Sequence, residues 1–444
     1  MKKLFLILLI SLLLCFVLCG CQKPSVSLLD SQGDLFAEVT AGEPLKQDSF
    51  LSYTQIVLKE AIETLQSAKG IDKTAAEKEF YRGNYSVYTY LDLDALKQIN
   101  EAYLSLGKEV AFGCAVTDLK GGLIAVYSAG NEAEDTTNFA TAKTQPFSAF
   151  KPLSVYAPAI ENGLINYSSS FFDTPYKQIE GPDGSKRDWP ANADGKYLNH
   201  DVTLSYAVKR SLNTVAVKCL AKVGVNQSLQ FLRKSFDLDL VDERTKASVY
   251  GEEEVIGNLA MGYLLDGVSP VDMAGYYAVF DGSGVYNAPK TIVKICDSSG
   301  NEIFQRNRMN IQAISLETAA IMNHLLSEVV SYGGTGEKAN CGDIPVVGKT
   351  GTGDNNSGNW FVGLTPDYSC AIWHANVENN NLAPDYFSRV LQELKQTKEE
   401  FLLQGSVKKA IYCADSGMIL GPKCKKAEVG YYTEGNFPAV CDIH

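Results

Sequence analysis

The chain has 444 residues, of which 45% are hydrophobic and 21% are charged, so it can form two or three domains with buried cores. Its formal net charge is −12, from 40 basic and 52 acidic residues. This balance excludes nucleic acid as an expected partner, because no basic excess exists to neutralise phosphates.

The first residues are typical of an export signal. Lys2 and Lys3 precede an apolar run over residues 4–18 that is short for a membrane span, and Leu18-Cys-Gly-Cys21 follows. The latter tetrapeptide resembles the bacterial lipobox, which implies cleavage before Cys21 and lipidation of its thiol. We therefore expect residues 1–20 to be a lipoprotein signal peptide. The remainder should lie on the extracytoplasmic face of the bacterial cell membrane, anchored by its lipid.

Residues 21–84 are expected to form an N-terminal anchor or pedestal segment. Within it, residues 27–33 have the pattern of a strand and turn, and residues 52–69 carry apolar side chains at helical spacing. Residues 85–91 are rich in strand-forming types, and residues 92–106 follow a helical pattern. A β-hairpin is predicted next, with strands at 110–119 and 123–128 and two glycines in its turn.

Helical patterns dominate residues 151–280, and strands return at 344–347, 360–364 and 368–377. Strands at both ends with helices between them predict an α+β domain over residues 85–395, whose sheet joins early and late segments of the chain. Residues 396–444 form a cysteine-containing C-terminal tail without strong periodicity.

Three short motifs occur in order, and the first is Ser148-Ala-Phe-Lys151. A serine hydroxyl needs a neighbouring base to become a nucleophile, and a lysine three residues on lies on the same face of a helix. Pro152 is tolerated only in the first turn of a helix, which places Ser148 at the helix start, where the dipole favours negative charge. We therefore predict Ser148 as the nucleophile and Lys151, held neutral by burial and nearby positive charge, as the base.

The second and third motifs are Ser211-Leu-Asn213 and Lys349-Thr-Gly-Thr352. Ser211 is predicted to relay a proton, and Asn213 to hydrogen-bond the substrate backbone through its amide. In the third motif, Lys349 would raise the local positive potential, Thr350 and Thr352 would bind a substrate carboxylate, and Gly351 would allow close backbone approach. Backbone N–H groups of Ser148 and Thr352 would form an oxyanion hole. A second S-x-x-K pattern, Ser406-Val-Lys-Lys409, has no following proline, so the ordered set carries the prediction.

Over roughly residues 85–376 the chain resembles the transpeptidase domain of class A penicillin-binding proteins. The similar segments are residues 145–152, 204–217, 267–274, 333–336, 348–352 and 359–363. The resemblance implies a β-lactamase/transpeptidase-like fold, with an antiparallel sheet flanked by helices and a mostly helical subdomain. It also implies a D,D-transpeptidase that cross-links peptidoglycan stem peptides ending in D-Ala-D-Ala through an acyl-serine intermediate, and that binds β-lactam antibiotics.

Two features depart from that family. Phe147 stands where the family usually has glycine, and it would be strained if the position requires a positive φ. The motif of the glycosyltransferase module, E-D-x-x-F-x-x-H-x-G, does not occur in the sequence. We therefore expect a protein that only cross-links peptides, and the N-terminal segment leaves open whether a separate glycosyltransferase docks there.

Three other functions stay open at this point. A D,D-carboxypeptidase differs only in using water as the acceptor. A β-lactamase needs a glutamate that activates water between the second and third motifs, where the nearest match, Glu254-Val-Ile-Gly-Asn258, lacks the leucine of the family motif. A non-catalytic β-lactam-binding scaffold would follow if Phe147 abolished activity.

Eight cysteines follow Cys21, and five of them lie in mostly apolar contexts that predict buried small side chains: Cys114, Cys219, Cys296, Cys341 and Cys370. The tail ends with Cys413, Cys424, Cys441 and His444. Three thiolates and an imidazole can close a structural zinc site, a disulfide can join two of the cysteines, or the thiols can stay reduced and unligated. No other cofactor is expected.

Overall fold

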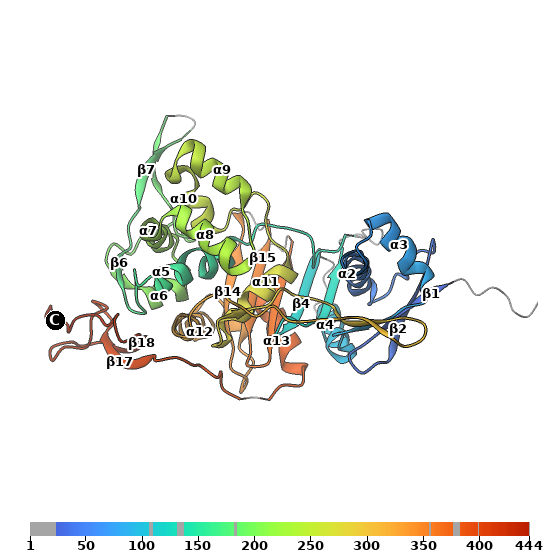
Figure 1. The fold of residues 1–444 in the computed structure, drawn as a ribbon. Coiled ribbons are helices and arrows are strands. Elements are labelled where there is room, and N and C mark those ends of the chain that lie inside the picture. Colours follow the sequence, from blue (N-terminus) through green and yellow to red (C-terminus); the bar gives the residue numbers. More distant parts are fainter. Residues whose placement is uncertain are drawn as a thin grey trace, which may run out of the picture. The chain divides into compact units, whose positions relative to one another are not determined.

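The computed structural model describes residues 24–105, 110–130, 137–181, 184–354, 357–375, 382–397 and 399–443 (Figure 1). The chain divides into two compact units. The first ends at Leu91 and also takes in Thr291–Arg306, and the second comprises Asp92–Lys290 and Asn307–His444. The expected boundary between residues 84 and 85 therefore falls inside the first unit, because strand β3 (Ser86–Thr89) belongs to its sheet.

In its described residues, from residue 24 on, the first unit has a five-stranded sheet, in the strand order β12-β11-β3-β1-β2, and two helices. Its other elements are β1 (Ser25–Leu29), β2 (Leu35–Thr40), β11 (Ile292–Cys296), β12 (Glu302–Gln305), α2 (Leu51–Lys69) and α3 (Lys73–Arg82). The returning segment is fixed by Glu60 of α2, whose carboxylate accepts a 2.7 Å hydrogen bond from Thr291 N and pairs with Arg306. No short-range pattern could have predicted this return, because its partners are more than two hundred residues away in the sequence.

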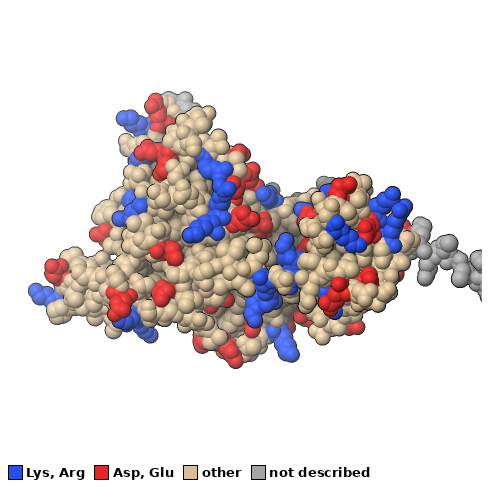
Figure 2. Space-filling view, viewed as in Figure 1, with Lys and Arg blue, Asp and Glu red and all other residues tan. Residues whose placement is uncertain are grey.

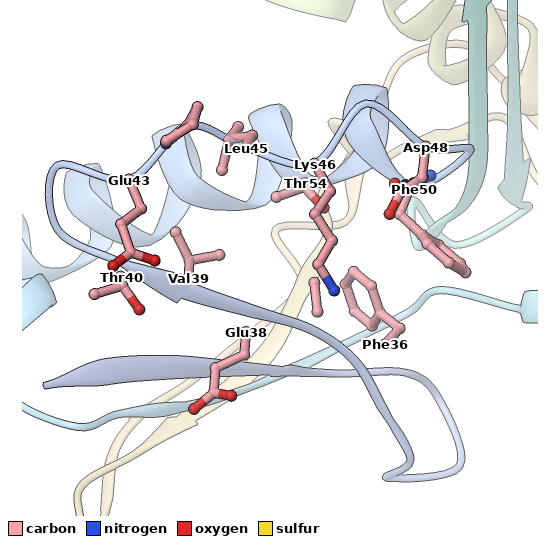
Figure 3. A pocket seen from close by; sticks show the side chains of 12 residues that line it. Phe36, Glu38, Val39, Thr40, Glu43, Leu45, Lys46, Asp48, Phe50 and Thr54 are labelled. Atoms are coloured by element: carbon pink, nitrogen blue, oxygen red, sulfur yellow. Dashed lines mark hydrogen bonds between the residues drawn. The ribbon is translucent and has the colours of Figure 1, made fainter. Parts of the chain in front are cut away.

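A shallow hollow of about 120 Å³ lies in the first unit between β2, the loop that follows it and the start of α2 (Figure 3). Phe36 and Phe50 close part of its wall with ring centroids 5.8 Å apart, and Glu38, Glu43 and Lys46 bring charges to it. None of the residues of the three motifs lines this hollow.

The central sheet of the second unit is antiparallel, in the strand order β14-β15-β16-β4-β5. Its strands are β4 (Phe112–Asp118), β5 (Leu123–Ala129), β14 (Val347–Thr352), β15 (Asn359–Leu364) and β16 (Tyr368–His374). The sheet thus joins the predicted early hairpin to late strands, as the cyan and orange arrows of Figure 1 show. The α+β fold with an antiparallel sheet flanked by helices is confirmed.

Both faces of this sheet are covered. Ser369 of β16 donates a hydrogen bond to Ala274 O in α11 (Pro270–Tyr277), whereas the ring of His374 lies near Tyr386 of α13 (Ala383–Glu393). Because residues 369 and 374 differ in parity, their side chains leave opposite faces of the strand. The central strands are therefore buried on both sides, which explains why β4, β15 and β16 are almost continuously apolar.

The helical part of the second unit lies between β5 and β14 in the sequence. Its elements are η1 (Phe147–Phe150), η2 (Pro152–Tyr156), α5 (Ala157–Glu161), α6 (Leu204–Arg210), α7 (Asn213–Val223), α8 (Val225–Phe236), α9 (Val241–Tyr250), α10 (Glu252–Met261), η3 (Ala278–Asp281), α12 (Leu316–Val330) and η4 (Glu337–Ala339). Helix α4 (Leu93–Ser105) precedes the sheet and packs on β5. Short two-stranded pairs interrupt the helices: β6 (Ser170–Phe172) with β9 (Asp201–Thr203), β7 (Lys177–Glu180) with β8 (Lys186–Trp189), and β10 (Val285–Tyr286) with β13 (Ile311–Gln312).

Two local expectations need correction. The strand predicted at residues 344–347 instead begins at Val347 and runs through Thr352, so the third motif forms the strand rather than following it. The tail, for which no element was predicted, contains a hairpin of β17 (Lys408–Cys413) and β18 (Ala427–Tyr432). Glycines and charged residues in both segments lower their apparent strand propensity, whereas backbone pairing with a neighbouring strand determines the structure.

On the face that Figure 2 shows, basic and acidic side chains are interspersed. Within the residues described, no helix combines the length and the hydrophobicity that crossing a bilayer requires. Cys21 and His444 lie outside the described residues.

Candidate active site

The first motif forms a helical turn that neighbouring elements hold in place. Ser148 lies in η1, and the helical run continues through η2 and α5. Trp360 Nε1 donates a 2.9 Å hydrogen bond to Gln145 O just before the turn, and the Tyr277 hydroxyl donates a 2.5 Å bond to Ala149 O within it. Ser148 is half-buried at the start of this run, as predicted, while the Lys151 side chain is fully buried.

The Lys151 amine binds the second motif. Its Nζ lies 2.8 Å from Ser211 O, 2.7 Å from Asn213 Oδ1 and 3.4 Å from Ser211 Oγ. The pKa of Lys151 lies well below its usual range. Burial is the main cause, and the positive charge of Lys349 is the second. A neutral amine donates two hydrogens, which the two short bonds use, so its lone pair is left to accept a proton from a serine hydroxyl.

Ser211 connects the two buried lysines. Lys349 Nζ donates a 2.8 Å hydrogen bond to Ser211 Oγ and a 3.1 Å bond to Thr350 O. Burial lowers the pKa of Lys349 to about 7. Because the charge of Lys349 contributes to the lowered pKa of Lys151, a cationic Lys349 favours a neutral Lys151.

A tight turn sets the position of the second motif. Ser211 has a left-handed backbone (φ 58°) between α6 and α7, where it ends one helix before Asn213 begins the next. Behind it, Asn192 accepts a 2.9 Å bond from Asn213 N and donates a 3.0 Å bond to the buried Asp173. The Asn213 amide also donates 2.8 Å to Ala191 O, so the predicted substrate-binding side chain is held by Lys151 on one side and this loop on the other.

Strand β14 approaches η1 closely because residue 351 has no side chain. A Cβ atom on Gly351 would lie 2.4 Å from Pro146 O and 3.1 Å from Ala149 N. The space beside Gly351, which was predicted to admit the substrate backbone, is thus filled by the turn that carries Ser148. This contact brings the first and third motifs together.

Thr335 is a site residue that the sequence analysis did not identify. Its Oγ1 lies 2.8 Å from Thr350 Oγ1, and its backbone N donates to Lys209 O. The sequence did contain an indication of it, because the Gly-Gly-Thr-Gly segment at residues 333–336 is one of those similar to the family. No function was predicted for that segment.

A cavity of about 360 Å³ is lined by residues of all three motifs, including Ser148, Ser211, Asn213, Thr350 and Thr352. Arg210, Met261, Tyr263, Thr335 and Asp354 complete much of its wall, together with Phe147, Ala193 and Gly353. Tyr263 donates a 2.8 Å hydrogen bond to Asp354 Oδ2, and burial followed by this bond raises the pKa of Tyr263 to about 12. The cavity thus offers hydroxyl groups, an amide, the Arg210 guanidinium and the Asp354 carboxylate to a ligand.

Phe147 has the positive φ that its place in the motif predicted, at 49°. Its ring is buried, with 5% of the residue exposed, and lies edge-on to Tyr263 with a centroid distance of 5.4 Å. The same ring fills the space that a side chain on Gly353 would occupy, since a Cβ atom there would lie 2.4 Å from it. The turn therefore combines backbone strain with strong packing.

Replacing Phe147 by glycine and by alanine should separate these two effects. Loss of the ring should lower the free energy of unfolding by roughly 3–5 kcal/mol in Phe147→Ala, where the left-handed backbone remains strained. Phe147→Gly loses the same ring but regains about 1–2 kcal/mol of strain, so it should be the more stable variant. This order reverses the usual advantage of alanine over glycine. Urea unfolding of both variants tests this order of stability. A higher free energy of unfolding for Phe147→Ala than for Phe147→Gly would contradict the backbone strain.

The buried Lys349 should make stability depend on pH. An unfolded lysine titrates near 10.4, so above about pH 7 the unfolded chain binds more protons here than the folded chain, and the free energy of unfolding rises with pH. Between about pH 7 and pH 9, the wild type should gain about 1.4 kcal/mol per pH unit relative to Lys349→Met. Urea unfolding at several pH values measures this difference, in which most other titrating groups cancel. A difference independent of pH would show that Lys349 has its ordinary pKa.

The predicted cysteines fall into two groups. The five predicted to be buried are so: Cys114, Cys219, Cys296, Cys341 and Cys370. In the tail, the structure brings Cys413, Cys424 and Cys441 together, with their sulfur atoms within 4.8 Å of one another.

Comparison with known proteins identifies the family. The model of the penicillin binding protein transpeptidase domain matches residues 113–392, which contain all three motifs. Penicillin-binding protein 1A of Clostridium acetobutylicum is 35% identical over 240 residues, which cover 53% of this chain and 28% of that protein. Penicillin-binding protein 1A of Clostridium tetani is 26% identical over 428 residues, or 88% of this chain and 54% of that protein. The chain therefore spans about half, or less, of the length of these relatives.

The fold is shared with solved structures as well. Penicillin-Binding Protein 1A from Haemophilus influenzae superposes with a TM-score of 0.70 at 15% identity, over 94% of this chain and 99% of that one. The family match covers more than half of the sequence and includes the cavity-lining motifs. The chain therefore belongs to the penicillin-binding protein transpeptidase domain family.

Proposed function

We propose that the protein is a serine D,D-transpeptidase that cross-links peptidoglycan stem peptides ending in D-Ala-D-Ala. The observation that carries this proposal is the series of contacts Lys151–Ser211–Lys349, with both lysines buried, beside a cavity lined by Ser148 and Ser211. It pairs a neutral base with a cation around one hydroxyl, as proton transfer to and from a serine requires.

In the acylation step, Ser148 Oγ attacks the carbonyl carbon between the two D-alanines, and Lys151 takes the hydroxyl proton. Backbone N–H groups of Ser148 and Thr352 stabilise the negative oxygen of the tetrahedral intermediate. The C–N bond then breaks as Ser211 passes its hydroxyl proton to the leaving amine and takes the proton that Lys151 had accepted, and D-alanine departs. Thr335, Thr350 and Thr352 bind the terminal carboxylate of the substrate, with the charge of Lys349 behind them.

In the second step an amine of a neighbouring stem peptide attacks the ester carbonyl, which restores Ser148 and forms the cross-link. A D,D-carboxypeptidase would admit water instead. β-Lactam antibiotics would acylate Ser148 in the same way, with the opened ring staying attached. The β-lactamase alternative has less support, because Glu254 is exposed on α10 and does not line the cavity.

The test is the fate of a stem pentapeptide incubated with the purified protein, with and without an amine acceptor. We expect release of D-alanine that depends on Ser148. The yield of cross-linked product should rise with acceptor concentration, while the yield of free tetrapeptide falls. If the tetrapeptide is the sole product at every acceptor concentration, the protein is a D,D-carboxypeptidase. Rapid turnover of penicillin without a lasting adduct would assign a β-lactamase.

The same proposal includes the location of the enzyme. Lipidation of Cys21 would hold it at the outer face of the membrane, where stem peptides are exposed, and a separate glycosyltransferase would supply the glycan strands. Metabolic labelling with a fatty acid analogue should mark the wild type but not Cys21→Ala. Equal labelling of the two would exclude this anchor.

A further inference from the structure

The tail of the second unit gathers three cysteines that the catalytic proposal does not use. Cys413 ends strand β17, Cys424 lies in the loop between β17 and β18, and Cys441 follows β18. Their sulfur atoms lie within 4.8 Å of one another, and the structure joins none of the described cysteines in a disulfide. Around a zinc ion with Zn–S bonds of 2.3 Å, tetrahedral geometry separates sulfur atoms by about 3.8 Å. The three thiols therefore need only small shifts to bind one ion.

Backbone contacts fix all three segments. Cys441 N donates a 2.8 Å hydrogen bond to Ile419 O, and Gly417 N donates a 2.8 Å bond to Cys413 O. Gly421 permits the close approach of the last segment, because a Cβ atom there would lie 2.1 Å from Cys441 O. Main-chain contacts thus hold the three cysteine-bearing segments close to one another.

Hydrogen-bond donors also point at the sulfur atoms. Gly421 N donates to Cys424 Sγ at 3.3 Å, and the Ser416 hydroxyl donates to Cys441 Sγ at 3.3 Å. Donors to sulfur stabilise thiolates and are the usual outer contacts of metal-bound cysteines. A disulfide would use two of the sulfur atoms and leave the third outside the bond.

We propose that Cys413, Cys424 and Cys441 bind one structural zinc ion as thiolates. Binding displaces the three thiol protons to solvent, with no change of oxidation state. Three soft thiolate ligands favour zinc over magnesium or calcium.

The site stabilises a module that packs against the catalytic unit. The Tyr432 hydroxyl donates a 2.8 Å bond to Ser168 Oγ, which itself donates a 2.5 Å bond to Gly417 O. Tyr431 stacks on His324 of α12 with ring centroids 3.4 Å apart, and α12 packs on strand β14 of the third motif. Zinc should therefore support the tail and, through α12, the stability of the unit, without taking part in acylation.

Zinc content of the full chain, purified under reducing conditions, tests the proposal. We expect one zinc per chain by elemental mass spectrometry, retained on dialysis. Each of Cys413→Ser, Cys424→Ser and Cys441→Ser should lower metal affinity at least tenfold, whereas Cys341→Ser, a buried cysteine elsewhere in the unit, should retain the ion. Cobalt(II) added to the metal-free protein should give a thiolate-to-cobalt charge-transfer absorption.

A second measurement does not depend on variants that fold. A zinc chelator should lower the Tm of the wild type, and zinc but not magnesium should restore it, because the ion binds the folded chain. The proposal would be overturned if the zinc content is near zero and all three thiols react with an alkylating agent. Two of the three resisting alkylation until a reductant is added would also overturn it, in favour of a disulfide.

Discussion

Lys151→Met should slow acylation by penicillin by roughly 10²–10⁴-fold, because general-base catalysis contributes about that factor and methionine cannot accept a proton. The side chains have similar length, so the substitution removes the amine and leaves the packing of η1 and η2 largely intact. Two acceptors, Ser211 O and Asn213 Oδ1, lose their donor, while the cost of burying an amine disappears. These effects oppose one another, so the Tm should stay close to that of the wild type. Stopped-flow measurement of acylation gives the rate.

Lys218→Met is the matched control. Lys218 is half-buried, its pKa is lowered by burial, and its Nζ binds Phe172 O at 2.6 Å and Thr174 O at 2.8 Å. It does not line the cavity. We expect this variant to lose stability but to acylate within about threefold of the wild type, since no proton transfer is affected. A similar loss of rate in both variants would indicate general disturbance and would contradict the role of Lys151.

Gly351→Ala should reduce acylation at least 100-fold although the residue does not react. The added Cβ would lie 2.4 Å from Pro146 O, which is backbone and cannot rotate away, so η1 and β14 must separate. A displacement of about 1 Å between reacting groups is enough for a 10²-fold loss. The effect should appear in the acylation rate and in the free energy of unfolding together, because the same contact packs the turn against the sheet.

Gly342→Ala provides the comparison for this variant. Gly342 has φ 68° and no atom within 4 Å of an added Cβ, so the substitution causes backbone strain without a clash. It should cost about 1–2 kcal/mol of stability and leave the acylation rate unchanged. If Gly351→Ala acylated as fast as Gly342→Ala, the close approach of η1 to β14 would not be needed for reaction.

The sequence was sufficient where the chemistry depends on short spacings. Ser148 and Lys151 are three residues apart, and Pro152 fixes where their helix begins, so their relation could be predicted without a structure. The strain at Phe147 was likewise predictable, because the preference of a position for glycine implies a positive φ. The hairpin over β4 and β5 followed from alternation and a Gly-Gly turn.

Contacts between distant segments were beyond the sequence. Thr335 contacts Thr350 because the loop after α12 folds back onto the edge strand β14. No periodic pattern in the sequence predicts such a contact. The third motif was expected to follow a strand, since glycines interrupt its β pattern, but pairing with β15 extends the strand through Thr352. The return of Thr291–Arg306 to the first unit depends on Glu60, far away in the chain.

Intact-mass spectrometry after exposure to penicillin tests whether Ser148 is the nucleophile, with the wild type, Ser148→Ala and Ser406→Ala compared. Ser406 belongs to the other S-x-x-K pattern and is exposed, where it binds Glu317. We expect one added penicillin mass on the wild type and on Ser406→Ala, and none on Ser148→Ala. An adduct that persists in Ser148→Ala, or an unmodified wild type, would contradict this role of Ser148.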